Sequence, residues 1–480
     1  MATYLGTSTL EFGSTHSSSR PKEMVREFQA IVMAGGRGSR MTEITAGRPK
    51  CTIPIGNKPM VWYPLNLLQR TGIKDAILVV MEQMKSAVQA ALEPLGLKIN
   101  VDIVTIADED WGTADTLRFL SDRIKSDVIV VSCDFITDMS LHPILDLHRL
   151  HSNGVMALYF EPQPSDNTLV TPGPKSKFKP ERDLVGLDEK TSRLVFVGSV
   201  SDFDSEVPIS REIMEKHPVI DMYSKITDAH FYIFKKWVVD FLVHKKNIST
   251  LKGELLPYLV KKQASKRNKI DKRAEANTSA IDEDTKKDIF DFAQESYLTL
   301  KVRNISFYND HKSDMNSAYH GDSIRCYGFL APSHKFGARI NTIVDYCNIN
   351  RQIKDRWEMV TGGVQFVRVH SSADIKSTQM DDTCMVGENT TIAEKTSIKA
   401  CIIGARCEIE SKVRLANCIL MNGVKIREGC ILSNCVVCDG VEICNNAELK
   451  DCLIGSNNVI SAEAKHTSEV LTVPDRLMQI

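Results

Sequence analysis

The chain has 480 residues, 42% of them hydrophobic and 25% charged, which is ordinary for globular proteins and enough for two or three domains. The chain has 60 basic and 61 acidic residues, so its net charge is −1. This balance excludes an overall electrostatic field that would steer the protein to nucleic acid or an anionic membrane. We therefore expect no membrane partner and no direct nucleic-acid binding.

The beginning of the chain carries no targeting signal. Residues 1–23 are rich in Ser and Thr and lack the apolar core of a signal peptide, and no apolar run reaches membrane-spanning length. We expect a disordered segment over residues 1–26 and a cytosolic protein. The odd count of thirteen cysteines then favours free thiols over disulfides.

The first half of the chain alternates two kinds of segment. Apolar runs predict strands at Phe28–Met33, Ala76–Met81, Ile103–Ile106, Val128–Ser132 and Val155–Phe160. Segments of helical character lie between and after them at Met60–Arg70, Lys85–Leu95, Thr113–Lys125 and Leu141–His151. This order predicts a Rossmann-like α/β domain with a mostly parallel sheet, which binds ligands at the carboxyl ends of its strands.

A glycine-rich loop follows the first predicted strand, where residues 34–50 read AGGRGSRMTEITAGRPK. Gly35 and Gly36 allow backbone N–H groups to turn around an anion such as phosphate. The loop lacks the Lys-Ser/Thr ending of a P-loop, and Met41 stands where a dinucleotide fingerprint has its third glycine. A tight turn without a ligand is the alternative interpretation.

Two more elements stand at predicted strand ends. Gly112, Thr113 and Ala114 open a helix, for which we expect Thr113 to be the N-cap, and Asp134 closes the fourth strand. In this order the three elements resemble the sugar-1-phosphate nucleotidyltransferases. The resemblance implies that Arg40 and Lys50 hold phosphates, that Gly112 and Thr113 contact the nucleoside, and that Asp134 holds Mg²⁺.

The sequence departs from that family at several points. The Gly-Asp of the enzymes is Cys133-Asp134, their Pro-Lys-Pro ends in Cys51, and no Glu-Lys-Pro follows the fifth strand. Glu254 could replace the second metal-binding acid, but we favour an exposed helix face for it. One carboxylate holds Mg²⁺ weakly. We therefore predict no catalytic residues and no metal site, with Mg²⁺ and a nucleotide as cofactors only if the inherited pocket is still occupied.

Residues 27–345 form the predicted nucleotidyltransferase-like domain. Within it, residues 261–287 are dense in charge and poor in apolar residues, which indicates a disordered insertion. A connector over residues 346–380 follows.

The last part of the chain is a repeat. Aliphatic residues recur every 17 positions at Val386, Ile403, Leu420, Val437 and Ile454, with further apolar steps of six between them. Six plus six plus five residues make one three-sided coil, which resembles the left-handed parallel β-helix of hexapeptide repeats. We place this β-helix at residues 381–462 and a tail at residues 463–480.

Cysteines share the period of the repeat at Cys401, Cys418, Cys435 and Cys452. Stacked coils would place them in a buried ladder as small apolar groups. Zinc needs four converging ligands and disulfides need close Cβ atoms, so neither fits a line of equivalent atoms about 4.8 Å apart.

The combination of both domains resembles the gamma/epsilon subunit family of eukaryotic translation initiation factor 2B. The segments that carry the resemblance are residues 56–68, 112–118, 132–138 and 450–455. Epsilon has an additional C-terminal helical-repeat domain, so the end of this chain favours the gamma branch. The resemblance implies a regulatory subunit that pairs with epsilon and the other subunits and helps bind translation initiation factor 2. An active nucleotide-sugar pyrophosphorylase and a pseudoenzyme that binds nucleotide without turnover are the alternatives.

Overall fold

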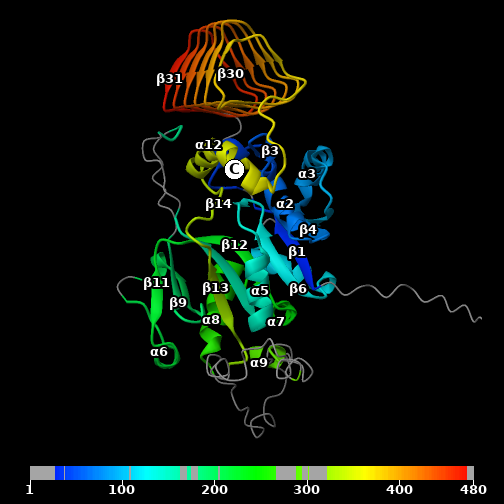
Figure 1. Cartoon of the computed structure of the whole chain (residues 1–480), viewed down its shortest axis with the longest axis vertical. Helices are drawn as coiled ribbons and strands as arrows, with labels where there is room; N and C mark the ends of the chain where they lie inside the picture. Colours follow the sequence, from blue (N-terminus) through cyan, green and yellow to red (C-terminus); the bar gives the residue numbers. More distant parts are fainter. Residues whose placement is uncertain are drawn as a thin grey trace, which may run out of the picture.

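The computed structural model of the chain describes residues 27–36, 38–107, 110–162, 170–173, 182–203, 206–265, 288–294, 301 and 322–472. Figure 1 shows an N-terminal α/β domain with a solenoid of short strands stacked on one end. The expectations for residues 1–26, for residues 266–287 of the predicted insertion and for residues 473–480 lie outside the described residues. None of the helices within these ranges is long and apolar enough to cross a membrane.

A seven-stranded sheet forms the centre of the N-terminal domain, in the order β13-β8-β12-β6-β1-β4-β5. Its strands are β1 (Phe28–Met33), β4 (Asp75–Met81), β5 (Asn100–Ile106), β6 (Asp127–Ser132), β8 (Val155–Phe160), β12 (Thr227–Phe234) and β13 (Cys326–Leu330). The five predicted strands are confirmed. Only β12 runs antiparallel to its neighbours, so the sheet is mostly parallel as expected.

Helices cover both faces of this sheet. The helices α4 (Thr113–Phe119), α7 (Lys236–His244) and α8 (Leu256–Gln263) pack on one face. The helices α2 (Trp62–Arg70), α3 (Lys85–Leu92) and α5 (His142–His151) pack on the other. Residues 261–263, which we expected to belong to the insertion, are the last residues of α8.

Smaller elements flank the central sheet. A second sheet has the order β10-β9-β11, with β9 (Asp183–Asp188), β10 (Leu194–Ser199), β11 (Ile220–Tyr223) and the helix α6 (Arg211–Lys216) beside it. A hairpin joins β2 (Pro54–Ile55) to β3 (Lys58–Pro59), and short helices lie at α1 (Thr42–Thr45) and α9 (Ile289–Phe292).

The strand β14 (Gly337–Arg339) lies near the end of the expected domain of residues 27–345, and the long helix α12 (Ile343–Thr361) reaches from there into the expected connector of residues 346–380. β14 pairs antiparallel with β7 (Phe135–Thr137), which directly follows Asp134. Thr342 caps α12, because its Oγ1 accepts a hydrogen bond from the backbone N–H of Asp345 (3.2 Å). Gly362 ends the helix in a left-handed conformation (φ 71°).

The C-terminal solenoid has three parallel sheets of six short strands, consistent with a left-handed β-helix, as predicted. Its strands run from Asp374 to Leu471, so the coils begin before and end after the expected residues 381–462. The first sheet has β15 (Asp374–Ile375), β18 (Thr391–Ile392), β21 (Glu408–Ile409), β24 (Lys425–Ile426), β27 (Glu442–Ile443) and β30 (Val459–Ile460). The second has β16 (Gln379–Met380), β19 (Ser397–Lys399), β22 (Arg414–Ala416), β25 (Ile431–Ser433), β28 (Glu448–Lys450) and β31 (Lys465–Thr467). The third has β17 (Met385–Val386), β20 (Ile402–Ile403), β23 (Ile419–Leu420), β26 (Val436–Val437), β29 (Leu453–Ile454) and β32 (Val470–Leu471).

The 17-residue period sets the register between coils. Val386 pairs with Ile403, which pairs with Leu420, and the ladder continues to Leu471. Each corner of the coil needs a left-handed residue, so positive φ angles recur at the same interval. One such row is Ala400, Asn417, Asn434, Asp451 and Ser468.

All thirteen cysteines are free thiols, as predicted. Cys401, Cys418, Cys435 and Cys452 form the expected buried ladder inside the β-helix. Among the residues that the structure describes, no three His, Cys, Asp or Glu side chains are grouped as metal ligands.

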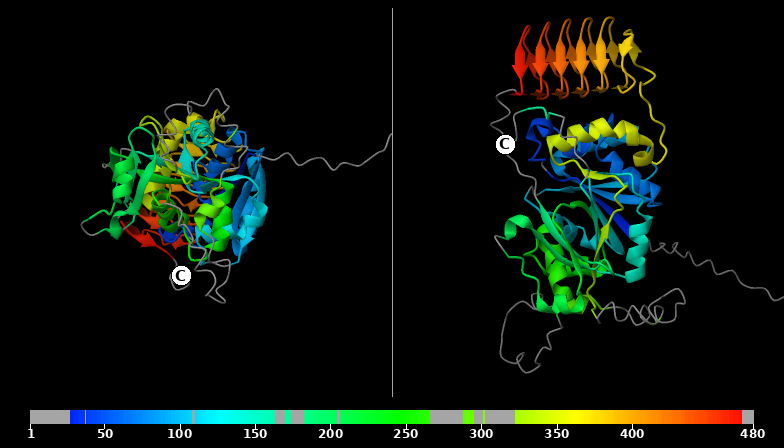
Figure 2. Two further views of the ribbon diagram at one scale, coloured as in Figure 1. Left: turned by 90° about the horizontal axis from the view of Figure 1, so that it is seen from below. Right: turned by 60° about the vertical axis from the view of Figure 1, so that its left-hand side comes forward.

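One face of the β-helix docks on the N-terminal domain, above α12 (Figure 2). The outward side chains of its third sheet are apolar and buried at Met385, Ile402, Ile419, Val436 and Leu453. They form one core with residues from α1, α2 and α12. Arg351 of α12 also donates to Asn417 Oδ1 (3.0 Å) and Asn434 Oδ1 (2.8 Å) at a corner of the coils. The two domains therefore share a continuous core.

Candidate functional site

The glycine-rich loop leaves the carboxyl end of β1, as expected. Gly38 needs to be glycine because its φ is 72°, and a Cβ on Gly35 would lie 3.0 Å from Ile106 Cδ1. At Gly36 a Cβ would meet nothing within 4 Å, so the fold itself does not require glycine there. The open space beside Gly36 is compatible with a ligand that approaches the backbone. Arg40 is exposed on the same loop.

Lys50 and Asp134 are in direct contact, although 84 residues separate them. Lys50 begins the short 3-10 helix η1 (Lys50–Thr52), and its Nζ lies 2.6 Å from Asp134 Oδ2. Arg339, the last residue of β14, donates from Nε to Asp134 Oδ1 and from Nη2 to Asp134 Oδ2, both at 3.3 Å. These three residues are called the Asp134 cluster below.

Electrostatic interactions keep Asp134 and Arg339 ionised. Burial alone would raise the pKa of Asp134, but Arg339 and Lys50 outweigh it and hold that pKa well below its usual range. Burial likewise opposes the charge on Arg339, whereas Asp134 raises the pKa of this arginine. Asp134 is 2% exposed, so water screens these interactions little.

The resemblance implies a Mg²⁺ ion on Asp134, but the residues present do not fit one. Both carboxylate oxygens accept hydrogen bonds from Arg339, and one also contacts Lys50. Mg²⁺ requires several oxygen ligands at about 2.0–2.1 Å. A guanidinium and an ammonium group occupy the space beside the carboxylate instead.

A second buried polar group lies on a bulge of β12. Asp228 accepts hydrogen bonds from the backbone N–H of His230 (2.7 Å) and the hydroxyl of Tyr232 (2.6 Å). Burial raises the pKa of Asp228 and lowers that of His230 well below its ordinary value. Arg339 interacts electrostatically with Asp228, so this group lies beside the Asp134 cluster.

The prediction that Thr113 caps α4 was wrong. Gly112 is the N-cap, and its N–H donates to Asp115 Oδ2 (3.0 Å), while Thr113 Oγ1 accepts from the N–H of Leu251 (2.9 Å). A Cβ on Gly112 would lie 2.0 Å from Ser249 O, because the chain at Ser249 crosses directly over this turn. The resemblance assigns Gly112 and Thr113 to contact with a nucleoside. In this structure both residues instead pack against the chain at Ser249 and Leu251.

Glu254 lies on an exposed helical face, as we expected. Its carboxylate accepts from the backbone N–H groups of Ser249 (2.5 Å) and Thr250 (3.1 Å), so it holds the start of the π-helix η6 (Leu251–Leu255). It does not supply a second acid to the Asp134 cluster.

Sequence reasoning missed Arg339. It lies 205 residues after Asp134, and no motif marks it. Only the pairing of β14 with β7, in which Arg339 stands opposite Phe135, places it there.

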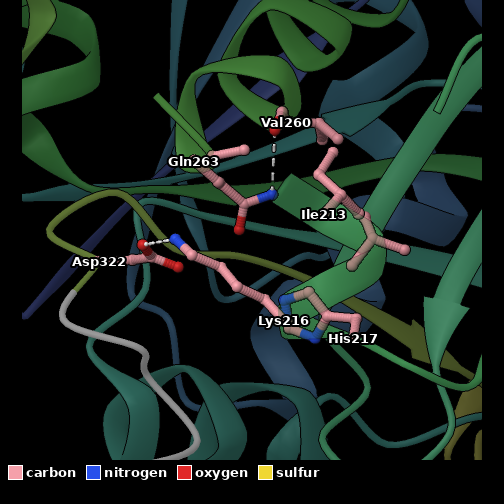
Figure 3. A pocket seen from close by; sticks show the side chains of 8 residues that line it. Ile213, Lys216, His217, Val260, Gln263 and Asp322 are labelled. Atoms are coloured by element: carbon pink, nitrogen blue, oxygen red, sulfur yellow. Dashed lines mark hydrogen bonds and ion pairs between the residues drawn. The ribbon is translucent and has the colours of Figure 1, made fainter. Parts of the chain in front are cut away.

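A small pocket lies between α6, α8 and Asp322 (Figure 3). Lys216 Nζ donates to Asp322 Oδ1 (2.6 Å), and Arg193 Nη2 donates to Asp322 Oδ2 (3.0 Å). Gln263 donates to the carbonyl of Val260 (3.3 Å). These polar groups pair with one another, so we interpret the pocket as a structural contact between elements.

The fold defines a nucleotidyltransferase-like domain, in which Asp134 at the strand end is paired with Lys50 and Arg339, joined to a left-handed β-helix. The nucleotidyl transferase family matches residues 29–274, more than half of the 480-residue chain. The chain therefore belongs to the nucleotidyl transferase family. Residues 367–466 match the family described as the EIF2B subunit epsilon LbH domain.

Three relatives are informative. The translation initiation factor eIF2B subunit gamma of Schizosaccharomyces pombe is 38% identical over 247 residues, which are 50% of this chain and 52% of that protein. The protein of the same name from Dictyostelium discoideum is 24% identical over 401 residues, 78% of this chain and 86% of that protein. A mannose-1-phosphate guanyltransferase of Candida albicans is 28% identical over 129 residues, 26% of this chain and 35% of that protein. The match thus spans about half the length of the fission-yeast protein.

Proposed function

We propose that the chain is a non-catalytic, regulatory subunit of the guanine-nucleotide exchange factor for translation initiation factor 2. In this role it works in the cytosol, pairs with an epsilon subunit, assembles with the other subunits and helps bind translation initiation factor 2. The observation that carries the proposal is the similarity to proteins named gamma subunits, which in the Dictyostelium protein covers 78% of this chain. The Asp134 cluster supports the absence of catalysis.

The seven residues of the glycine loop, the α4 turn and the β6 end are proposed as an inherited nucleotide site. They are Gly35, Gly36, Arg40, Lys50, Gly112, Thr113 and Asp134. Nucleotide exchange on a GTPase requires a partner of the GTPase, the exchange factor, that binds the nucleotide-free form more tightly than the GDP-bound form. In this proposal the chain contributes contact surface and scaffold to that partner.

Stoichiometric purification tests the proposal. Tagged full-length chain from a cytosolic extract should recover a subunit with a related domain and a helical C-terminal extension, together with translation initiation factor 2. The recovered complex should release GDP from that factor faster than the chain-depleted complex does. Recovery of copies of this chain alone would contradict the proposal.

The relative named mannose-1-phosphate guanyltransferase favours a second candidate, an active sugar-1-phosphate nucleotidyltransferase. Pyrophosphate exchange with nucleoside triphosphates and hexose phosphates separates the two. Turnover by the purified chain that Asp134→Asn abolishes would overturn the non-catalytic role. GTP binding without turnover, lost in Arg40→Ala, would instead favour a nucleotide-binding pseudoenzyme.

A further inference from the structure

We infer that Arg339 excludes divalent cations from the inherited pocket, because its guanidinium stands in the place of a metal ion on Asp134. The inference rests on the Asp134 cluster alone and not on the proposed role in nucleotide exchange.

The contact between the Arg339 guanidinium and the Asp134 carboxylate is bidentate. Arg339 Nε lies 3.3 Å from one carboxylate oxygen and Nη2 lies 3.3 Å from the other. This fork matches the planar carboxylate and engages both oxygens at once. A metal ion would have to displace the guanidinium before it could bind either oxygen from that side.

Arg339 is held in this position by the backbone. In the pairing of β14 with β7, the N–H of Ile340 donates to the carbonyl of Asp134 itself (3.0 Å). Two residues later Thr342 caps α12, so both ends of the short segment are anchored. The anchored backbone therefore keeps the Cα of Arg339 beside the strand that follows Asp134.

Charge adds to this steric argument. The guanidinium cannot lose its proton in a protein, and Lys50 brings a second cation to within 2.6 Å of Asp134. The side chains of Arg339, Lys50 and Asp134 are only 16%, 9% and 3% exposed, so a further divalent cation would face weakly screened repulsion. The guanidinium of Arg339 thus neutralises the carboxylate of Asp134, as a bound metal ion otherwise would.

Mn²⁺ binding by full-length chain tests this inference, with free Mn²⁺ followed by electron paramagnetic resonance. Wild type should bind no Mn²⁺ that depends on Asp134. Arg339→Asp removes the guanidinium and adds a carboxylate, so it should bind one Mn²⁺ at least about tenfold more tightly than wild type. The double variant Arg339→Asp, Asp134→Asn should lose that gain.

Two further variants keep the test decisive. Arg414→Asp makes the same charge change on an exposed face of the β-helix and should leave Mn²⁺ binding unchanged. Arg339→Gln, a neutral change, replaces Arg339→Asp if circular dichroism shows that the latter is unfolded, and it should bind Mn²⁺ more tightly than wild type.

Either of two results would overturn the inference. One is a stoichiometric Mn²⁺ ion on wild type that Asp134→Asn removes. The other is a folded Arg339 variant that binds no more Mn²⁺ than wild type. Neither result changes which subunits the chain recovers from an extract, so the proposed function fails or stands separately.

Discussion

The guanidinium of Arg48, in the loop after β1, forms an ion pair with Asp439 on the β-helix, 391 residues away. Arg48 also donates to the carbonyl of Thr52 (2.7 Å), and Asp439 accepts from the N–H of Asn422 (2.9 Å). The last residues of the glycine-rich loop therefore contact the second domain through Arg48 and belong to the Asp134 cluster through Lys50.

Breaking this pair should weaken the interface between the two domains. Arg48→Ala leaves a partly buried carboxylate without its partner, so we expect a loss of about 1–3 kcal/mol in the free energy of unfolding. Denaturant unfolding followed by tryptophan fluorescence measures it. Arg149→Ala is the control, because Arg149 and Glu27 form an exposed pair whose loss should cost less than about 1 kcal/mol. Equal losses in both variants would contradict a special role for Arg48.

The apolar docking face predicts a contrast between two isoleucines of the β-helix. Ile419 points from the third sheet into the shared core (7% exposed), whereas Ile431 points outward from the second sheet (41% exposed). Ile419→Lys buries an unpaired charge and should cost about 3 kcal/mol or more, while Ile431→Lys should stay within about 0.5 kcal/mol of wild type. Thermal unfolding and limited proteolysis between the domains check this, and equal tolerance of both changes would count against the docked arrangement.

Asp134 should make stability depend on pH in the acid range. Its pKa is lower in the folded chain than in the unfolded one, so the unfolded state binds more protons between the two values. Stability from Asp134 is therefore complete above the ordinary aspartate pKa of about 3.9 and is lost as the pH falls below it. At neutral pH Asp134→Asn leaves the cations of Lys50 and Arg339 without their carboxylate partner, and we expect a loss of about 3–5 kcal/mol. The difference from wild type should shrink steadily as the pH falls below about 4.

Asp228→Asn is the matched control for this pH dependence. Burial raises the pKa of Asp228, so its ionisation opposes folding and its effect on stability has the opposite sign. As the pH falls from 7 to 3, the free energy of unfolding of wild type should therefore decrease relative to that of Asp134→Asn but increase relative to that of Asp228→Asn. Parallel curves for all three proteins would refute the ionised Asp134 cluster.

The thiols should differ sharply in reactivity. Twelve of the thirteen cysteines are buried, and burial raises the pKa of Cys51, Cys347 and Cys438 to about 12. Since the thiolate is the reactive form, alkylation of the native chain should be confined to Cys444, which is partly exposed. Mass spectrometry of peptides labelled before and after unfolding measures this. Cys444→Ser should abolish native labelling, and rapid labelling at Cys418 would contradict the packed ladder.

Patterns that repeat over short distances were readable in the sequence. Alternating apolar and helical segments predicted the five parallel strands, because strand and helix periods leave a local signature. The 17-residue interval predicted the β-helix and its buried cysteine ladder, since each coil stacks on an equivalent one. The same interval also marks Met385, Ile402, Ile419, Val436 and Leu453, a row of outward apolar residues that could have revealed the docking face.

The chemistry of the candidate site was decided by tertiary structure alone. Lys50, Asp134 and Arg339 belong to separate elements. No periodic pattern in the sequence predicts the pairing of β14 with β7, which brings Arg339 to Asp134. Likewise, the chain at Ser249 lies over Gly112 where the distant segments α4 and η6 meet. Local sequence sets local conformation and burial, but contacts between distant segments depend on the whole core. The sequence by itself thus determined the two domain types, while long-range packing decided that a cation of the chain faces Asp134.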